Sequence, residues 1–284
     1  MNDCEKWIYE HSEDNAYRYI LGTKGDNPLI CFGVNPSTAC PEELDNTMRI
    51  VSTTAERLGY DSYIMLNLYP QRATNPDEMD KILNKDAFFE NLKYIENVLC
   101  RSNLKLWAAW GTLINKRPYL IKTLEKVEKM AEKYSCQWMI LGQKSKDGHP
   151  HHPLYLAKTA EPEKFDVNQY IEEFTKSMIG KVVTVTVDRP MGTYHPEHET
   201  LYYPVNYGFV KGITAADGEE QDAYILGVYT PVRKFTGRIA AIIRRENDIE
   251  DKWVVIPENV CFTEEEIRWQ VHFQEKFFKT EIIM

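Results

Sequence analysis

Acidic residues gather on two turns in the second half of the sequence, and their spacing suits a divalent cation. Asp217, Glu219 and Asp222 lie at positions i, i+2 and i+5 around a glycine, so a turn there would bring three carboxylates together. Magnesium prefers oxygen ligands and often shares its coordination shell with water and substrate phosphates. A second acidic turn, residues 246–251, precedes Lys252. The first turn predicts a magnesium site, whereas the second is equally typical of a solvated surface turn.

A tyrosine-rich segment shortly before the first acidic turn makes the pattern more specific. Residues 203–209 are Tyr-Pro-Val-Asn-Tyr-Gly-Phe. Together with the acidic loop and the lysine after the second acidic turn, this segment makes residues 178–284 resemble the soluble inorganic pyrophosphatases. The resemblance implies a hydrolase that cleaves a phosphoanhydride with bound magnesium ions.

The same resemblance implies roles for individual residues. Four carboxylates are expected to bind magnesium: Asp217, Glu219, Asp222 and Glu250. The expected catalytic residues of this half are Tyr207, Asp217, Asp222 and Lys252. Lys252 matches a lysine that contacts phosphate in that family, and Tyr203 matches a tyrosine of the substrate site.

The segment before the tyrosines departs from the pyrophosphatase pattern. An early hairpin that supplies a lysine, a glutamate and an arginine in that family is nearly absent, and residues 188–198 take its place. We expect a different phosphate pocket, built from Arg189, His195, His198, Arg244 and Lys279. Histidines outside a motif are more often structural, so those two are the weaker members. The substrate is therefore open between pyrophosphate and a nucleotide, and loss of activity is a further alternative.

Four polar blocks in the first half form a second candidate site. They are residues 33–39, 67–76, 108–111 and 148–154. Over residues 5–158 they resemble the family known as domain of unknown function 1643, and they are more distantly similar to the uracil-DNA glycosylase superfamily. The glycosylase resemblance implies a site for a nucleobase or nucleotide.

The candidate residues of this second site have types that suit such chemistry. An asparagine at a strand end, Asn35, can orient water, and a histidine on a proline-stiffened loop can neutralise charge on a departing base. His149 or His152 is the expected histidine, with Asn67 and Arg72 lining the site. A metal site of the three loop histidines is disfavoured because the prolines of the loop restrict their convergence and no carboxylate partner is evident. The His-His-Pro sequence of the loop also departs from the glycosylase pattern.

Alternating apolar and amphipathic segments predict the elements that position these blocks. Predicted strands cover residues 29–34, 63–69, 104–111 and 136–141, and predicted helices cover residues 42–58, 88–99 and 119–134. Such alternation indicates an α/β fold, with a mostly parallel sheet covered by helices on both faces. Sites in such sheets lie beyond the carboxyl ends of the strands, where the polar blocks fall.

A change of pattern near residue 180 divides the chain. We expect a glycosylase-like α/β domain over residues 1–160, a linker helix over 161–178 and a pyrophosphatase-like domain over 179–284. No strand is predicted between residues 160 and 166. Alternating β-branched residues after Gly180 predict a small β-barrel, and a helix over 263–278 follows it.

Charge and hydropathy narrow the class of partner and the location. The chain of 284 residues carries a net charge of −9. Both sides of the division carry more acidic than basic residues, which disfavours duplex DNA as a partner. No apolar run is long enough to span a bilayer, and the N-terminus lacks the order of a signal peptide. We therefore expect a cytoplasmic protein with a small phosphorylated substrate and no membrane partner; a homo-oligomer is open.

These observations favour a fused two-domain hydrolase, in which the second domain cleaves a phosphoanhydride with Mg²⁺ and the first handles a nucleobase or nucleotide. One alternative is an N-glycosylase acting on DNA or a nucleotide, with the barrel as an accessory. Another is a non-catalytic protein that binds a nucleotide with both domains.

Overall fold

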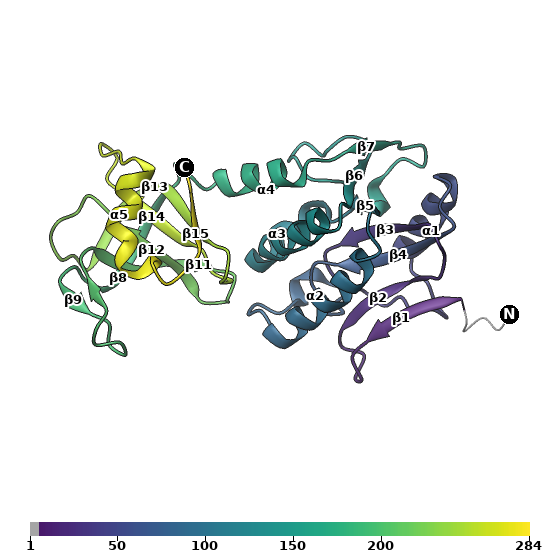
Figure 1. The fold of residues 1–284 in the computed structure, drawn as a ribbon, viewed down its shortest axis with the longest axis horizontal. Helices are drawn as coiled ribbons and strands as arrows, with labels where there is room; N and C mark the ends of the chain where they lie inside the picture. Colours follow the sequence, from purple (N-terminus) through teal and green to yellow (C-terminus); the bar gives the residue numbers. More distant parts are fainter. Residues whose placement is uncertain (1–5) are drawn as a thin grey trace. The chain divides into compact units, whose positions relative to one another are not determined.

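The computed structural model describes residues 6–284, so residues 1–5 of the predicted first domain lie outside the described residues. The chain divides into two compact units, Met1–Gln169 and Tyr170–Met284. The division falls within helix α4 (Val167–Lys176), inside the segment expected to link two domains. Figure 1 shows a helix-covered sheet in the first unit and a β-barrel in the second. The predicted fold class is thus confirmed.

The first unit is built on a seven-stranded sheet in the order β1-β2-β4-β3-β5-β6-β7. Four central strands run parallel: β3 (Pro28–Gly33), β4 (Ser62–Asn67), β5 (Lys105–Ala108) and β6 (Gln137–Leu141). Three outer strands pair antiparallel: β1 (Trp7–His11), β2 (Arg18–Thr23) and β7 (Pro162–Lys164). The carboxyl ends of the four parallel strands therefore meet at one edge of the sheet.

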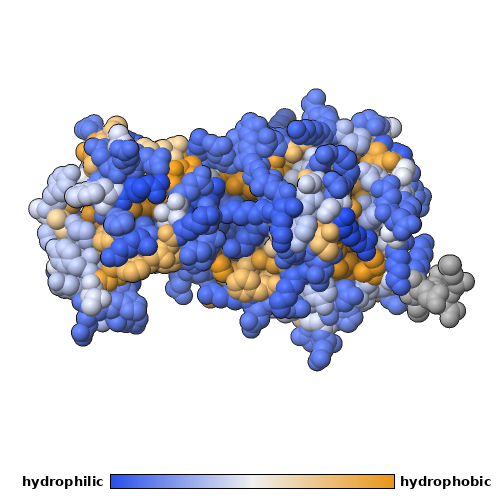
Figure 2. Space-filling view, viewed as in Figure 1, coloured by the Kyte–Doolittle hydropathy of each residue, from blue (hydrophilic) through white to orange (hydrophobic). Residues whose placement is uncertain are grey.

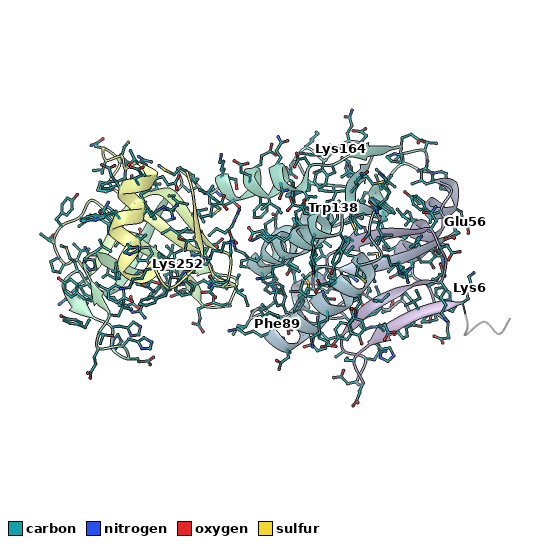
Figure 3. The ribbon with its side chains drawn as sticks, viewed as in Figure 1. Lys6, Glu56, Phe89, Trp138, Lys164 and Lys252 are labelled. Atoms are coloured by element: carbon teal, nitrogen blue, oxygen red, sulfur yellow. The ribbon has the colours of Figure 1, made fainter. Side chains whose placement is uncertain are left out.

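Helices cover both faces of this sheet (Figure 1). On one face, Met48 and Val51 of α1 (Asn46–Arg57) pack with the buried strand residues Leu29 and Cys31. Side chains alternate along a strand, so the next residues point to the opposite face. There α2 (Lys85–Leu99) and α3 (Pro118–Lys133) lie, and Trp138 donates a hydrogen bond to Glu128 of α3. Figure 3 labels Trp138 at this position.

Short 3₁₀ helices join these elements: η2 (Pro76–Glu78), η3 (Gly111–Lys116) and η4 (Pro153–Tyr155). Two expectations for the first unit need correction. The hairpin of β1 and β2 was not predicted, and β7 lies where no strand was expected. β7 contains Pro162, which an edge strand tolerates because one of its sides needs no ladder hydrogen bond.

The second unit is a closed five-stranded barrel. Its strands are β8 (Val182–Arg189), β11 (Asn206–Thr214), β12 (Glu220–Ile225), β13 (Lys234–Arg245) and β14 (Lys252–Ile256). The sheet closes because β14 pairs parallel with β12 on one side and antiparallel with β13 on the other. β15 (Thr280–Ile283) adds to β13, and β9 (Thr193–Tyr194) and β10 (Tyr202–Tyr203) form a small hairpin of their own. This confirms the predicted barrel.

The terminal helix α5 (Glu264–Glu275) packs its buried residues Ile267 and Val271 against the barrel core. Thr263 caps it, and the side chain of Glu266 completes a capping box. Among the described helices of both units, none combines the length and the apolar character that a bilayer crossing requires. In the space-filling view, hydrophilic residues cover most of the visible surface of each unit, with smaller hydrophobic patches between them (Figure 2).

Candidate functional site

The predicted magnesium ligands line one cavity of the barrel. This cavity has a volume of about 320 Å³, and of the described residues six carboxylates contribute to its wall. They are Asp188, Asp217, Glu219, Glu220, Asp222 and Glu250. Arg189 and Phe209 complete the wall. The structure thus brings together all four carboxylates that the sequence predicts as metal ligands.

Strand pairing explains this convergence. Asp217 and Glu219 lie on the turn between β11 and β12, where the backbone N–H of Glu219 donates to Asp217 Oδ1 at 3.0 Å. Asp222 follows on β12, opposite Phe209 of β11. Glu250 precedes β14, the parallel neighbour of β12. Two acidic turns that lie about thirty residues apart in the sequence therefore reach the same end of the barrel.

Asp222 is the centre of a hydrogen-bonded group. Its Oδ2 accepts from the hydroxyl of Tyr207 at 2.5 Å and from Nζ of Lys252 at 2.6 Å. Lys252 also pairs with Glu250. Burial raises the pKa of the Tyr207 hydroxyl, so this group stays protonated and acts as a donor. Figure 3 labels Lys252 on the barrel.

Glu250 and Asp188 are carboxylates in a restricted environment. Burial raises the pKa of Glu250 to about 7, and its Oε1 is buried without a hydrogen-bond partner in the part of the chain that the structure describes. Burial, together with the nearby charge of Asp222, raises the pKa of Asp188. In both cases burial is the largest cause of the raised pKa, and the charge of Asp222 adds to it.

Arg189 brings a positive charge to the same wall. Its guanidinium lies 5.2 Å from the ring centroid of Tyr207 and 5.9 Å from that of Tyr203, and it pairs with Asp188 at 3.1 Å. Tyr203 is buried in the core and packs against Phe273, so it supports Arg189 rather than lining the cavity.

The other cations of the expected phosphate pocket lie elsewhere. Arg244 bonds to Glu281 of β15 at 3.1 Å, and Lys279 pairs with Glu246 at 2.5 Å. The half-buried His195 and the exposed His198 contact each other, with ring centroids 4.7 Å apart. The structure does not bring these four residues to the cavity wall beside Arg189. Arg244 lies away from the cavity because its position on β13 places it beside β15. β15 was not predicted from the sequence.

The donor set of the cavity fits magnesium in chemical type, because the oxygen-rich wall holds the hard ligands this ion prefers. Within residues 6–284, however, no three acidic, histidine or cysteine side chains are already gathered around one point. Asp217, Glu219, Asp222 and Glu250 would hold the ion, with water and substrate oxygens completing its shell.

The first unit has a larger cavity, of about 790 Å³, at the carboxyl ends of its parallel strands. Asn35 and His152 line it, as predicted. The amide nitrogen of Asn35 donates to the carbonyl of Ala73 at 2.8 Å, which fixes the orientation of this side chain. Burial lowers the pKa of His152, which favours the neutral ring.

The remaining predicted residues of this site do not belong to the cavity wall. His149 is buried, with Nε2 3.1 Å from the amide nitrogen of Asn115. Arg72 holds neighbouring loops by donating to Tyr9, Asn15 and the carbonyl of Thr38. Both therefore have structural partners.

Asn67 lies directly beneath the wall. The residue is 1% exposed, and among the described residues neither its amide nitrogen nor its amide oxygen has a hydrogen-bond partner. A Cβ added to Gly33, a wall residue, would lie 2.9 Å from Asn67 Oδ1 and 2.6 Å from Met65 Cε. Glycine at this position therefore lets the backbone of the wall approach the Asn67 side chain closely.

Arg18 is a wall residue that sequence reasoning missed. It begins β2, is 2% exposed and donates to the carbonyl of Ala39 at 2.9 Å. A single arginine in a segment without a predicted strand does not indicate a binding site in the sequence. Only the pairing of β2 within the sheet brings Arg18 to the cavity.

Comparison with known proteins matches the two halves separately. A family model described as "Protein of unknown function (DUF1643)" matches residues 18–154, slightly less than half of the chain. This confirms the resemblance predicted for the first half. The chain matches none of the curated proteins with which it was compared.

Solved structures that resemble the chain include inorganic pyrophosphatases. One from Neisseria gonorrhoeae has 18% identity and a TM-score of 0.28, over 33% of this chain and 72% of its own. Others are from Ehrlichia chaffeensis (18%, 0.30, over 36% and 85%) and Coxiella burnetii (20%, 0.29, over 37% and 86%). The predicted resemblance to this family is thus found again, but similarity this low carries no argument about activity.

Proposed function

We propose that the barrel hydrolyses a phosphoanhydride with bound Mg²⁺, its substrate being pyrophosphate or a nucleotide. The observation that carries this proposal is the gathering of six carboxylates with Arg189 in one cavity, where Lys252 contacts two of the six. So many carboxylates would repel an anionic substrate unless cations neutralised them. The cavity therefore suits a phosphate group that arrives with divalent cations.

The chain's own residues have definable tasks in such a reaction. Lys252 and Tyr207 hold Asp222 in one orientation through the hydrogen bonds at 2.6 and 2.5 Å. Arg189 contributes a guanidinium that can contact phosphate oxygens in a forked geometry. Magnesium, when bound, supplies charge neutralisation and polarises the phosphoryl oxygens.

The test measures phosphate release by the full-length protein from pyrophosphate and from a panel of nucleoside triphosphates, with magnesium and with chelator. We expect magnesium-dependent release that falls about 100-fold in Asp222→Asn, the scale of removing a group that positions charge at a reacting centre. Glu258→Gln, an exposed carboxylate outside the cavity, is the matched control. Release without magnesium, or an Asp222→Asn variant as active as the control, would refute the proposal.

We further propose that the cavity of the first unit binds a nucleobase, with Asn67 as the recognising group. An amide with a free donor and a free acceptor matches the paired donors and acceptors of a base edge. The buried amide of Asn67 has both free, beneath a wall that includes Asn35 and His152. A buried polar group without partners is costly, and a bound base would offset that cost.

Calorimetric titration of the full-length protein with nucleosides tests this second function. Asn67→Ala should weaken binding at least tenfold, whereas Asn97→Asp on the exposed surface of α2 should leave it unchanged. Release of free base from a bound nucleoside, lost in Asn35→Ala, would add N-glycosidic cleavage. Binding that survives in Asn67→Ala would contradict the assignment.

A further inference from the structure

A buried arginine that forms no ion pair with the described residues lies at the wall of the larger cavity. Arg18 is 2% exposed, its Nε is buried without a hydrogen-bond partner, and no carboxylate of the described residues forms an ion pair with it. Within residues 6–284, its guanidinium donates to the neutral carbonyl of Ala39, at 2.9 Å. Burying a charge without a partner costs free energy, so binding of an anion beside Arg18 would be favourable.

A second arginine strengthens the positive potential. Arg72 approaches the same carbonyl of Ala39, at 3.5 Å, and its other acceptors are the neutral groups of Tyr9, Asn15 and Thr38. Burial, followed by the charge of Arg72, lowers the pKa of Arg18 to about 10, so the side chain is still protonated at neutral pH.

The charges that face Arg18 are few. Asp45, the N-cap of α1, is a carboxylate of the cavity wall whose charge raises the pKa of Arg18 without forming an ion pair with it. Its Oδ1 accepts from the backbone N–H of Met48 at 2.9 Å. His151 and His152 also lie in the wall. The first turn of α1 opens onto the cavity, and helix N-termini favour anions.

The rest of the wall provides neutral hydrogen-bonding groups. The serine and threonine residues of the wall are Ser37, Thr47, Thr74, Thr112 and Ser145. In this respect the cavity is the opposite of the barrel cavity, with its six carboxylates. Its volume of about 790 Å³ falls in the range of cavities that enclose small ligands, about 300–1,000 Å³.

We propose that this cavity binds a phosphate monoester, a nucleoside 5′-monophosphate, with Arg18 and the N-terminus of α1 contacting the phosphate. The inference extends the nucleobase binding proposed above, but the phosphate site rests on Arg18 and not on Asn67. A small phosphate ester is also a ligand class that agrees with the net negative charge of the chain, which disfavours duplex DNA.

The test compares four nucleoside 5′-monophosphates (adenosine, guanosine, cytidine and uridine) with their nucleosides by calorimetry. Full-length protein is used in chelator, so that magnesium-dependent binding at the barrel does not contribute. We expect at least one monophosphate to bind tenfold or more tightly than its nucleoside. Arg18→Met should reduce this preference to within twofold, and Arg101→Met, an exposed arginine after α2, should preserve it. No preference for any monophosphate, or an unchanged preference in Arg18→Met, would overturn the proposal.

Hydrogen exchange of the wild-type protein gives a second readout that does not depend on a folded variant. Bound monophosphate should protect peptides that contain Arg18 and residues 34–48. Protection confined to residues 186–222 of the barrel would overturn the inference. Ribose 5-phosphate separates the two proposals for this cavity: protection of residues 34–48 by this probe supports the phosphate site even if nucleosides fail to bind, and the absence of protection by every phosphate ester refutes it.

Discussion

A buried ion pair ties the terminal helix to the barrel, and its removal gives a quantitative prediction. Arg245 donates to both carboxylate oxygens of Glu275, from Nε at 2.9 Å and from Nη2 at 2.5 Å. The two residues are 4% and 5% exposed. The hydroxyl of Tyr224, fully buried, donates to the same carboxylate at 2.5 Å. Glu275 is therefore the acceptor for three buried donor atoms.

Glu275→Gln leaves the buried arginine charge with the more exposed Asp248, 3.2 Å from Nη1, as its remaining carboxylate partner. Loss of one partner of a buried pair costs about 3–5 kcal/mol, and an amide that still accepts one hydrogen bond places this change near the lower end, about 3 kcal/mol. For a unit of this size we expect the melting temperature to fall by about 12 °C, since 1 kcal/mol corresponds to about 4 °C.

Native-state hydrogen exchange of α5 and β13 peptides in the full-length protein reports the stability of this unit by itself. The matched control lies on the same helix: Glu264 pairs with Arg268 at 2.6 Å, and both side chains are about half exposed. Because exposed pairs contribute about 0.5 kcal/mol, Glu264→Gln should have little effect.

A triple change separates the charge from the packing. Arg245→Met with Glu275→Leu removes both charges, and Tyr224→Phe removes the donor that would lose its acceptor. This variant should recover most of the stability lost in Glu275→Gln, because apolar replacement of a buried pair is often neutral. A loss below about 1 kcal/mol in Glu275→Gln, or a triple variant no more stable than it, would refute the reasoning.

Three further predictions concern single groups. Burial raises the pKa of Glu128 from 4.5 to about 7, so between these two pH values the folded state keeps a proton that the unfolded state has lost; the free energy of unfolding should therefore fall by up to about 3 kcal/mol as the pH rises through this range. Glu128→Gln, which still accepts from Trp138, should flatten that decline in melts from pH 5 to 8. An unchanged pH profile would argue against this prediction. Thr263→Ala removes the capping box with Glu266 and should cost about 1 kcal/mol, seen as faster exchange in α5, and equal protection in both proteins would contradict this. Gly208→Ala would place a Cβ 2.0 Å from a backbone oxygen of β8, so circular dichroism should show a strongly destabilised barrel, whereas native stability would exclude this close approach.

The central strands of the first unit could be predicted from the sequence because they are nearly continuous apolar runs. All six residues of β3 and of β4 are buried, because helices cover both faces of the sheet. Their sequences therefore show no alternation of apolar and polar residues. β2 is also buried throughout, yet it begins with Arg18 and contains a glycine, and neither is typical of a core strand. Tertiary contacts decide its conformation.

In the candidate site of the barrel, features that depend on neighbouring residues could likewise be predicted from the sequence, whereas features that depend on distant contacts could not. The acidic turn at Asp217 and Asp222 is local, so its spacing is visible in the sequence. Closure of the barrel is not local, because β14 reaches β12 through a parallel pairing. The expected phosphate pocket places Arg244 and Lys279 beside Arg189, but neither charge nor residue type reveals which strand lies beside which.

Sheet edges differ between the two units, with a consequence for self-association. Closure leaves the five barrel strands paired on both sides, but the seven-stranded sheet is open and ends in β1 and β7. β7 is only three residues long, fully exposed, and consists of Pro162, Glu163 and Lys164. Strand addition is unfavourable at β7 for two reasons. The proline has no amide hydrogen to donate, and the two charged side chains would lose their hydration. At high protein concentration, this short charged strand acts as a barrier to aggregation through the β6 side of the sheet.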